Sequence, residues 1–175
     1  MSLESLEKFL RQIDPQLMFE SQSSYVFFIV FSRAEYALKN CKYIKSCSGK
    51  VHKADADWDT FAKANENKFT PKKSKELYDA VEYFIKNSPK LQVVNAGVID
   101  WKDSNPYANW KNGQLEWLLL MIRRVRNNLF HGGKYPKFPV EEPSRNRELL
   151  LHSITILNEC IELEQRVSDC FYEYV

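Results

Sequence analysis

Apolar side chains recur every three or four residues along most of this 175-residue chain, the spacing of one face of an α-helix. Asp57 and Thr70-Pro71 are typical helix starts, because a capping side chain or an early proline suits the first turn. These signals predict helices over about residues 3–13, 23–40 and 57–61, from Thr70-Pro71 to Ser88, and over about 114–131 and 145–172.

Two of these helices are apolar over more than one face. The helix over 23–40 is apolar on every side through Phe31, which predicts a central, buried element. The last helix has two adjacent apolar stripes, Leu150, Ile154, Leu157 and Ile161, and Leu149, Ile156, Cys160 and Leu163. So wide a face exceeds what one neighbouring helix usually covers, and we expect part of it to be a dimer seam.

Residues 89–113 lack helical spacing. Their valine and isoleucine residues favour either a small hairpin or an irregular loop, with Trp101, Tyr107 and Trp110 as anchors. The predicted fold is therefore all-α, an up-and-down bundle of four to five main helices in a single domain, 1–175, with a longer insert before the helix over 114–131.

Composition narrows the class of protein. A 44% hydrophobic and 27% charged chain is ordinary for a globular domain. No apolar run approaches the roughly 18 to 20 residues of a membrane span, and the N-terminus lacks the pattern of a signal peptide. The four cysteines form no C-x-x-C pair. We expect a cytoplasmic, reduced protein without a membrane partner, and buried thiols.

The net charge of +2 conceals an uneven distribution. Residues 141–175 carry 3 basic and 8 acidic side chains, which leaves 22 and 15 for residues 1–140, a surplus of +7. No acidic residue lies between Glu116 and Glu141, where five basic ones do. Such a patch suits a polyanion such as RNA, although an ordinary solvated helix face explains it equally well.

The helix over 114–131 carries the candidate chemistry. Leu115, Leu118, Ile122, Val125 and Leu129 form its inward stripe, opposite a polar group of Arg123, Arg124, Asn127 and His131. Arg126 lies on the flank, about 100° from Asn127. Gly132-Gly133 ends the helix, and a histidine in the last turn titrates near neutral pH. A histidine that moves protons and an arginine that binds phosphate suffice for metal-free RNA cleavage.

Residues 123–134, RRVRNNLFHGGK, resemble the signature of the HEPN (higher eukaryote and prokaryote nucleotide-binding) domains. These helical-bundle proteins carry an arginine, four to six residues and then a histidine. Here four residues separate Arg126 from His131, and the polar Asn127 follows the arginine. Residues 31–39, which include Glu35, resemble the acid-bearing early helix of that family. The rest of the chain agrees only in helix order and length.

The resemblance implies a metal-independent endoribonuclease that leaves a 2′,3′-cyclic phosphate and a 5′-hydroxyl. Arg126 and His131 would be the catalytic pair, Asn127 their polar companion and Glu35 a supporting residue. A homodimer would bring two motifs together across one cleft. Many members are toxins, phage-defence nucleases or stress factors with a neutralising antitoxin or regulatory protein; others are inactive scaffolds or nucleotide binders.

Other interpretations remain open for several residues. Arg123, Arg124 and Lys134 are candidate RNA contacts or solvated cations, and Glu35 also has the spacing for an exposed helix pair with Lys39. His52 and His152 have no acidic or cysteine partner at the spacing of metal ligands and no phosphate loop is present, so we expect neither metal nor cofactor. The alternatives to a nuclease are a non-catalytic HEPN module that binds RNA, nucleotide or protein, and a purely structural interaction module.

Overall fold

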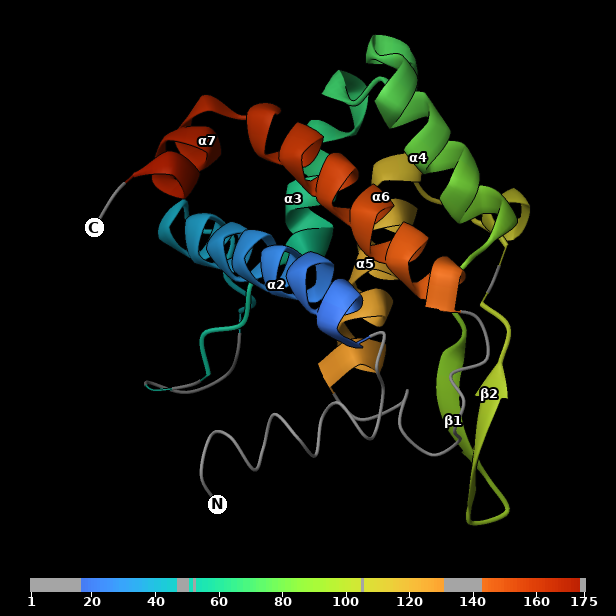
Figure 1. Ribbon diagram of the computed structural model, residues 1–175. Helices are drawn as coiled ribbons and strands as arrows, with labels where there is room; N and C mark the ends of the chain where they lie inside the picture. The colour runs from blue at the N-terminus through green and yellow to red at the C-terminus, as the bar shows by residue number, and fades with distance from the viewer. Residues whose placement is uncertain (1–16, 47–50, 52, 105, 131–142, 174–175) are drawn as a thin grey trace.

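The computed structural model describes residues 17–46, 51, 53–104, 106–130 and 143–173. Over these residues the chain is an all-α bundle, as predicted, with one small hairpin (Figure 1). The helix predicted over 3–13 lies outside them. The α-helices are α2 (Leu17–Asn40), α3 (Trp58–Asn65), α4 (Lys75–Lys86), α5 (Gln114–Phe130), α6 (Pro143–Glu162) and α7 (Gln165–Tyr172). Short 3-10 turns, η1 (Glu66–Lys68), η2 (Pro71–Lys73) and η3 (Tyr107–Asn109), lie between them.

Side-chain caps mark the starts of α3 and α4, and the cap of α3 is the predicted one. The Asp57 side chain accepts a hydrogen bond from the backbone N–H of Thr60 at the start of α3. At α4 the cap is Ser74, which accepts from the N–H of Leu77. Thr70-Pro71 instead begins the separate turn η2, so this predicted helix starts four residues late.

The central element of the bundle is α6, which packs against α2, α4, α5 and α7. Figure 1 shows α6 crossing the middle of the molecule. The prediction that part of its apolar face is a dimer seam is wrong for Leu150, Leu157 and Ile161, which are buried within the chain. Four neighbouring helices of the same chain cover the face that looked too wide for one.

The prediction that α2 is the central, buried element is also wrong. Its inner face, with Phe27 and Phe31 in the core, packs against α6 and α7. Tyr25 and Phe28 on the other faces are 67% and 47% exposed. Among the described residues, the helices that α2 meets pack on its inner face, and the composition of its other faces does not change this. Even so, none of the helices in the described ranges is long and apolar enough to span a bilayer.

The predicted helix over 145–172 is two helices. α6 ends at Glu162, and Glu164 has an extended backbone before α7 begins. From α2, Arg33 donates hydrogen bonds to the carbonyls of Phe171 and Glu173 at the end of α7. Tyr43 Oη donates to Glu164 Oε2 over 2.7 Å. Tyr43 thus contacts the residue at the break, and Arg33 contacts the far end of α7; apolar spacing alone could not reveal the break.

Residues 89–113 contain a hairpin, which decides between the two predicted possibilities. Strands β1 (Leu91–Asn95) and β2 (Val98–Lys102) pair antiparallel. Ala96 and Gly97 connect them with φ values of 48° and 81°. Positive φ at both central positions is the signature of a tight two-residue turn that matches strand twist. The longer insert before α5 is therefore confirmed.

The start of α5 is fixed by a side chain from η1. Glu66 accepts a hydrogen bond from the backbone N–H of Leu115 at 3.2 Å. A side chain at Gly113 would collide with the Glu66 carboxylate. Glycine at this position therefore lets the carboxylate cap a helix whose first N–H groups need a partner. This contact sets the position of the helix that carries the candidate site.

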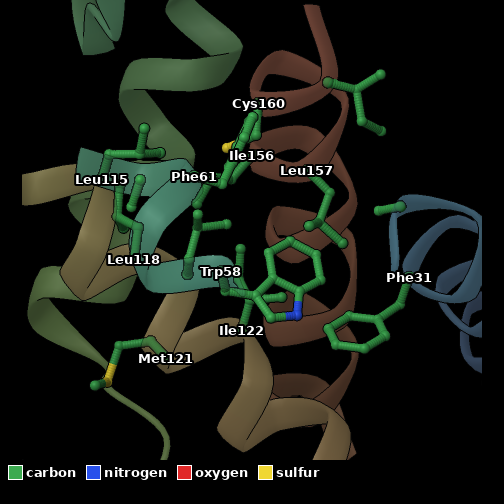
Figure 2. Packing of buried hydrophobic residues seen from close by; sticks show 14 of the residues in the cluster. Phe31, Trp58, Phe61, Leu115, Leu118, Met121, Ile122, Ile156, Leu157 and Cys160 are labelled. Atoms are coloured by element: carbon green, nitrogen blue, oxygen red, sulfur yellow. The ribbon is translucent and has the colours of Figure 1, made fainter. Parts of the chain in front are cut away.

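The core that supports α5 lies between it, α3 and α6. Figure 2 shows Leu118 and Ile122 of α5, Phe61 of α3 and Ile156 of α6 converging there. All four are 0–1% exposed. At the edge of this cluster the Phe31 and Trp58 rings lie 5.3 Å apart. Among the described residues, this packing buries the inward side of α5 and leaves its flanks and outward side accessible.

Candidate functional site

The inward stripe predicted for α5 is observed. Leu115, Leu118, Ile122 and Val125 are buried, and the partly buried Leu129 packs against the core. The polar residues of the last two turns therefore lie on the sides and outward face of α5. Phe130 is the last residue of the helix, and the predicted site residues His131 and Lys134 fall outside the described ranges.

Arg126 lies between α5 and α2. Its Nη2 is 3.3 Å from Glu35 Oε1, and its Nη1 donates to Asn127 Oδ1 over 3.0 Å. The guanidinium carbon is 5.2 Å from the centre of the Phe31 ring. On an ideal helix Arg126 points away from Asn127, but its long side chain bends back. Three candidate residues from the sequence thus form one contact group.

The partners hold Arg126 without burying it. The Arg126 side chain is 32% exposed and that of Glu35 28%. An ion pair with this much solvent contact contributes about 0.2–1 kcal/mol, and a ring beneath an exposed cation adds about 0.5–1 kcal/mol. These contacts orient the guanidinium and leave part of it open to solvent.

Glu35 belongs to the contact group and not to a pair along its own helix. Among the ion pairs of the described residues, Glu35 joins Arg126, and none links it to Lys39. One turn before Glu35 in α2, Phe31 lies under the same guanidinium. The carboxylate and the ring are four residues apart, and side chains at that spacing share a helix face.

Arg123 points in a different direction, toward α3. Its Nη2 lies 2.6 Å from Asp59 Oδ1, and its Nε donates to the carbonyl of Leu119. The predicted polar group of Arg123, Arg124, Asn127 and His131 stays a prediction, because His131 lies outside the described ranges; within these ranges Arg123 contacts Asp59, whereas Asn127 contacts Arg126. Asp59 was missed in the sequence. Its position beside a helix cap carries no signal that it faces α5.

Arg124 is partly buried on α5. Its Nη1 is 3.6 Å from the sulfur of Met121. Burial and the neighbouring charge of Arg123 lower the pKa of Arg124. The two adjacent arginines thus have different surroundings, one beside a carboxylate and one against a thioether.

The insert before α5 is tied to the same end of the helix. Asn128 Nδ2 donates to the carbonyl of Lys90, which directly precedes β1. The contact brings the base of the hairpin next to the last turn of α5. Asn128 lies inside the motif, but the sequence predicts no partner for its side chain.

Together these contacts show how the basic stretch of α5 is balanced. Glu35 of α2 and Asp59 of α3 supply carboxylates that the second half of α5 lacks. Within the described ranges, no three side chains among His, Cys, Asp and Glu converge as a metal site would need. The described residues of the site offer paired arginines and an amide. His131, the predicted histidine after Phe130, lies outside the described ranges.

Comparison of the chain with protein-family models, curated proteins and solved structures finds no match. Two features of the chain therefore point to a function. One is the contact group of Arg126, Glu35, Asn127 and Phe31. The other is the resemblance of residues 123–134 to the HEPN signature.

Proposed function

We propose that this protein is a metal-independent endoribonuclease of the HEPN type. The observation that carries the proposal is the contact group around Arg126. The motif arginine meets Glu35 and Asn127, the two residues that the resemblance assigns to the same site. Arg126 and Glu35 lie 91 positions apart in the sequence, on different helices, so their contact does not follow from the motif itself.

The proposed reaction needs no group beyond this chain. His131 would accept the proton of the 2′-hydroxyl or donate one to the departing 5′-oxygen. The 2′-oxygen then attacks phosphorus, and the products are a 2′,3′-cyclic phosphate and a 5′-hydroxyl. Arg126 would stabilise the charge that builds on the phosphoryl oxygens. A guanidinium has five N–H donors, so contacts to Glu35 and Asn127 leave donors for a phosphate.

Glu35 and Asn127 have supporting roles in this scheme. Each accepts a hydrogen bond from one end of the guanidinium fork, which fixes its plane. A fixed fork has less conformational freedom to lose when phosphate binds. The Phe31 ring closes the side of the guanidinium that faces the core.

We further propose that the enzyme acts as a homodimer in which two motifs face one RNA strand. The interface of this dimer would not include the apolar residues of α6 that are buried within one chain, because they are not accessible to a second protomer. A toxin, defence or stress role, in the cytoplasm and with a cognate antitoxin or regulatory protein, fits such a nuclease. Light scattering at tens of micromolar tests the dimer; a monomer would refute it.

A second function is favoured by one observation. Arg123 and Arg126 both have carboxylate partners, so the face carries less net positive charge than its sequence implies. A non-catalytic module that binds RNA, a nucleotide or a partner protein needs no more positive charge than this face retains. It differs from the first proposal by binding RNA without cutting it.

Cleavage of total RNA in excess chelator separates the two functions. We expect new 2′,3′-cyclic phosphate ends with the parent protein, and a loss of at least about 100-fold in Arg126→Ala and His131→Ala. Arg147→Ala, which removes an exposed arginine from α6, is the matched control and should cut normally. Cleavage that requires magnesium, or that survives in both motif variants, refutes the proposed mechanism.

A further inference from the structure

Two cysteine side chains far apart in the sequence meet where the end of α2 packs against α7. Cys41 follows α2 directly and is buried, while Cys170 lies within α7 and is half-buried. Their sulfur atoms are 3.7 Å apart, across a sequence separation of 129 residues. The Cys41 sulfur also lies 3.2 Å from the carbonyl oxygen of Arg166, one turn earlier in α7.

Other contacts hold these helices together independently of the cysteines. Arg33 Nε donates to the carbonyl of Phe171 over 3.1 Å, and Arg33 Nη2 donates to that of Glu173 over 2.6 Å. Tyr43, two residues after Cys41, donates to Glu164 just before α7 begins. The two thiols therefore stay close in the reduced protein without a covalent bond between them.

We propose that Cys41 and Cys170 form a reversible disulfide, a site of oxidative modification whose oxidant is a low-molecular-weight disulfide. The proposal is independent of the ribonuclease activity. An S–S bond of roughly 2.05 Å requires the sulfur atoms to approach further. Rotation of the two side chains supplies this movement, because each sulfur is the terminal atom of its side chain.

The chemistry is a pair of thiol–disulfide exchanges. The Cys170 thiolate, the more exposed sulfur, attacks the external disulfide, forms a mixed disulfide and releases one small thiolate. The Cys41 sulfur then attacks the sulfur of Cys170, and the second small thiolate leaves. The two protons of the protein thiols end on the two small thiols. The protein loses two electrons, and the external disulfide gains them.

The surroundings assign the order of these steps. Burial, with the adjacent Cys170, raises the pKa of Cys41 to about 11. Cys41 therefore has a smaller thiolate fraction than an ordinary thiol, and its burial keeps it from the external disulfide, so it attacks second, on the oxidised Cys170 beside it. Burial also raises the pKa of Cys160, which lies in the core and serves as an unreactive control.

Oxidation should stabilise the fold. A bond between residues 129 positions apart removes freedom from the unfolded chain. For a domain of this size we expect the midpoint of thermal unfolding to rise by about 5–15 °C. Dithiothreitol should return it to the starting value.

The test uses the full chain with Cys47→Ser, since Cys47 lies outside the described ranges. The protein is incubated with oxidised glutathione, alkylated, and analysed by peptide mapping and thermal unfolding. We expect the loss of two hydrogen atoms in mass, one linked peptide that joins Cys41 to Cys170, and the rise in midpoint. Cys160→Ala should behave in the same way, and Cys170→Ser should give neither change.

Several outcomes would overturn the proposal. They are a stable glutathione adduct on Cys170 without a link to Cys41, a linked peptide between another pair, or a midpoint that rises in Cys170→Ser as well. The peptide map of the parent chain decides the matter even if a variant fails to fold.

Discussion

At the scale of single residues, the candidate site is a set of arginines with assigned partners. Arg126 contacts Glu35, Asn127 and Phe31, whereas Arg123 contacts Asp59. The sequence supplied Arg126, Asn127 and Glu35 as candidates, through a resemblance. It could not supply Phe31 or Asp59 as partners, because no local pattern tells which side chains of α2 and α3 face α5.

The pairing of Arg123 with Asp59 predicts a gain in RNA binding when the carboxylate is removed. In an Asp59→Asn variant made in the His131→Ala background, Arg123 loses its partner and becomes available to phosphate. We expect affinity for single-stranded RNA to rise about two- to fivefold at low salt, with a salt slope steeper by about one. Fluorescence anisotropy across a salt series measures both.

The control for this prediction changes the same charge elsewhere. Asp79→Asn, on the exposed side of α4, alters net charge equally and should leave the salt slope unchanged. If both variants gain affinity alike, net charge and not the released Arg123 is responsible.

At the scale of elements, the sequence predicted helix positions better than helix ends and breaks. Capping by Asp57 and the stripe of α5 are local properties, so both were predictable. The hairpin remained one of two possibilities, because four apolar β-branched residues fit a loop as well as a strand. The break at Glu164 is not a local property of the apolar spacing, and Tyr43, which contacts Glu164 there, lies more than a hundred residues away in the sequence.

The cap on α5 predicts a non-additive pair of substitutions. Glu66→Ala removes the acceptor for the N–H of Leu115, and Gly113→Ala displaces the same carboxylate. Each should lower the free energy of unfolding by about 0.5–2 kcal/mol. The double variant should be only slightly less stable than the less stable of the two single variants, because both substitutions remove the same interaction. Urea unfolding measures all three; fully additive losses would refute a shared origin.

At the scale of the whole molecule, α6 occupies the place that the sequence assigned to α2. Both helices are rich in apolar residues, and composition alone does not tell a central helix from a peripheral one. The difference lies in neighbours: four helices pack on α6, whereas only one face of α2 meets α6 and α7. The overall class was predictable because it needs only the helical spacing.

This arrangement predicts unequal effects of truncation. Leu157→Ala in α6 leaves a cavity in the core and should lower the free energy of unfolding by about 2–5 kcal/mol. Phe28→Ala in α2 removes a side chain that is 47% exposed and should have an effect below about 1 kcal/mol. Denaturant unfolding at two protein concentrations measures both. A concentration-dependent loss at Leu157 would indicate an interface instead of a core.

The contact of Glu164 with Tyr43 predicts a pH dependence of global stability. Burial alone would raise the pKa of Glu164, but hydrogen bonds from Tyr43 and Arg166 outweigh it and lower the pKa overall. A carboxylate with a lowered folded-state pKa stabilises the fold above its unfolded pKa, about 4.3. The stabilisation is lost as the pH falls through the folded-state pKa.

We therefore expect Glu164→Gln to lower the free energy of unfolding by about 1–2 kcal/mol at pH 7. The difference from the parent protein should vanish in strong acid, because the parent carboxyl is then neutral too. Thermal unfolding of both proteins between pH 7 and pH 3 measures this difference in stability. Glu82→Gln, from the exposed pair with Lys86, is the control and should show little difference at any pH. A constant difference at Glu164 would mean that shape, not charge, matters.

The packing of α2 against α6 and α7 has a consequence for how the chain is made. α2 ends at Asn40, and the helices that cover its inner face begin only at Pro143 and Gln165. At about 5–20 residues per second, a ribosome needs on the order of 5–20 s to produce them. During that interval Phe27 and Phe31 lack the cover of α6 and α7 on a nascent chain. Chaperones that bind apolar helices should therefore recognise this segment during synthesis, before the fold can close.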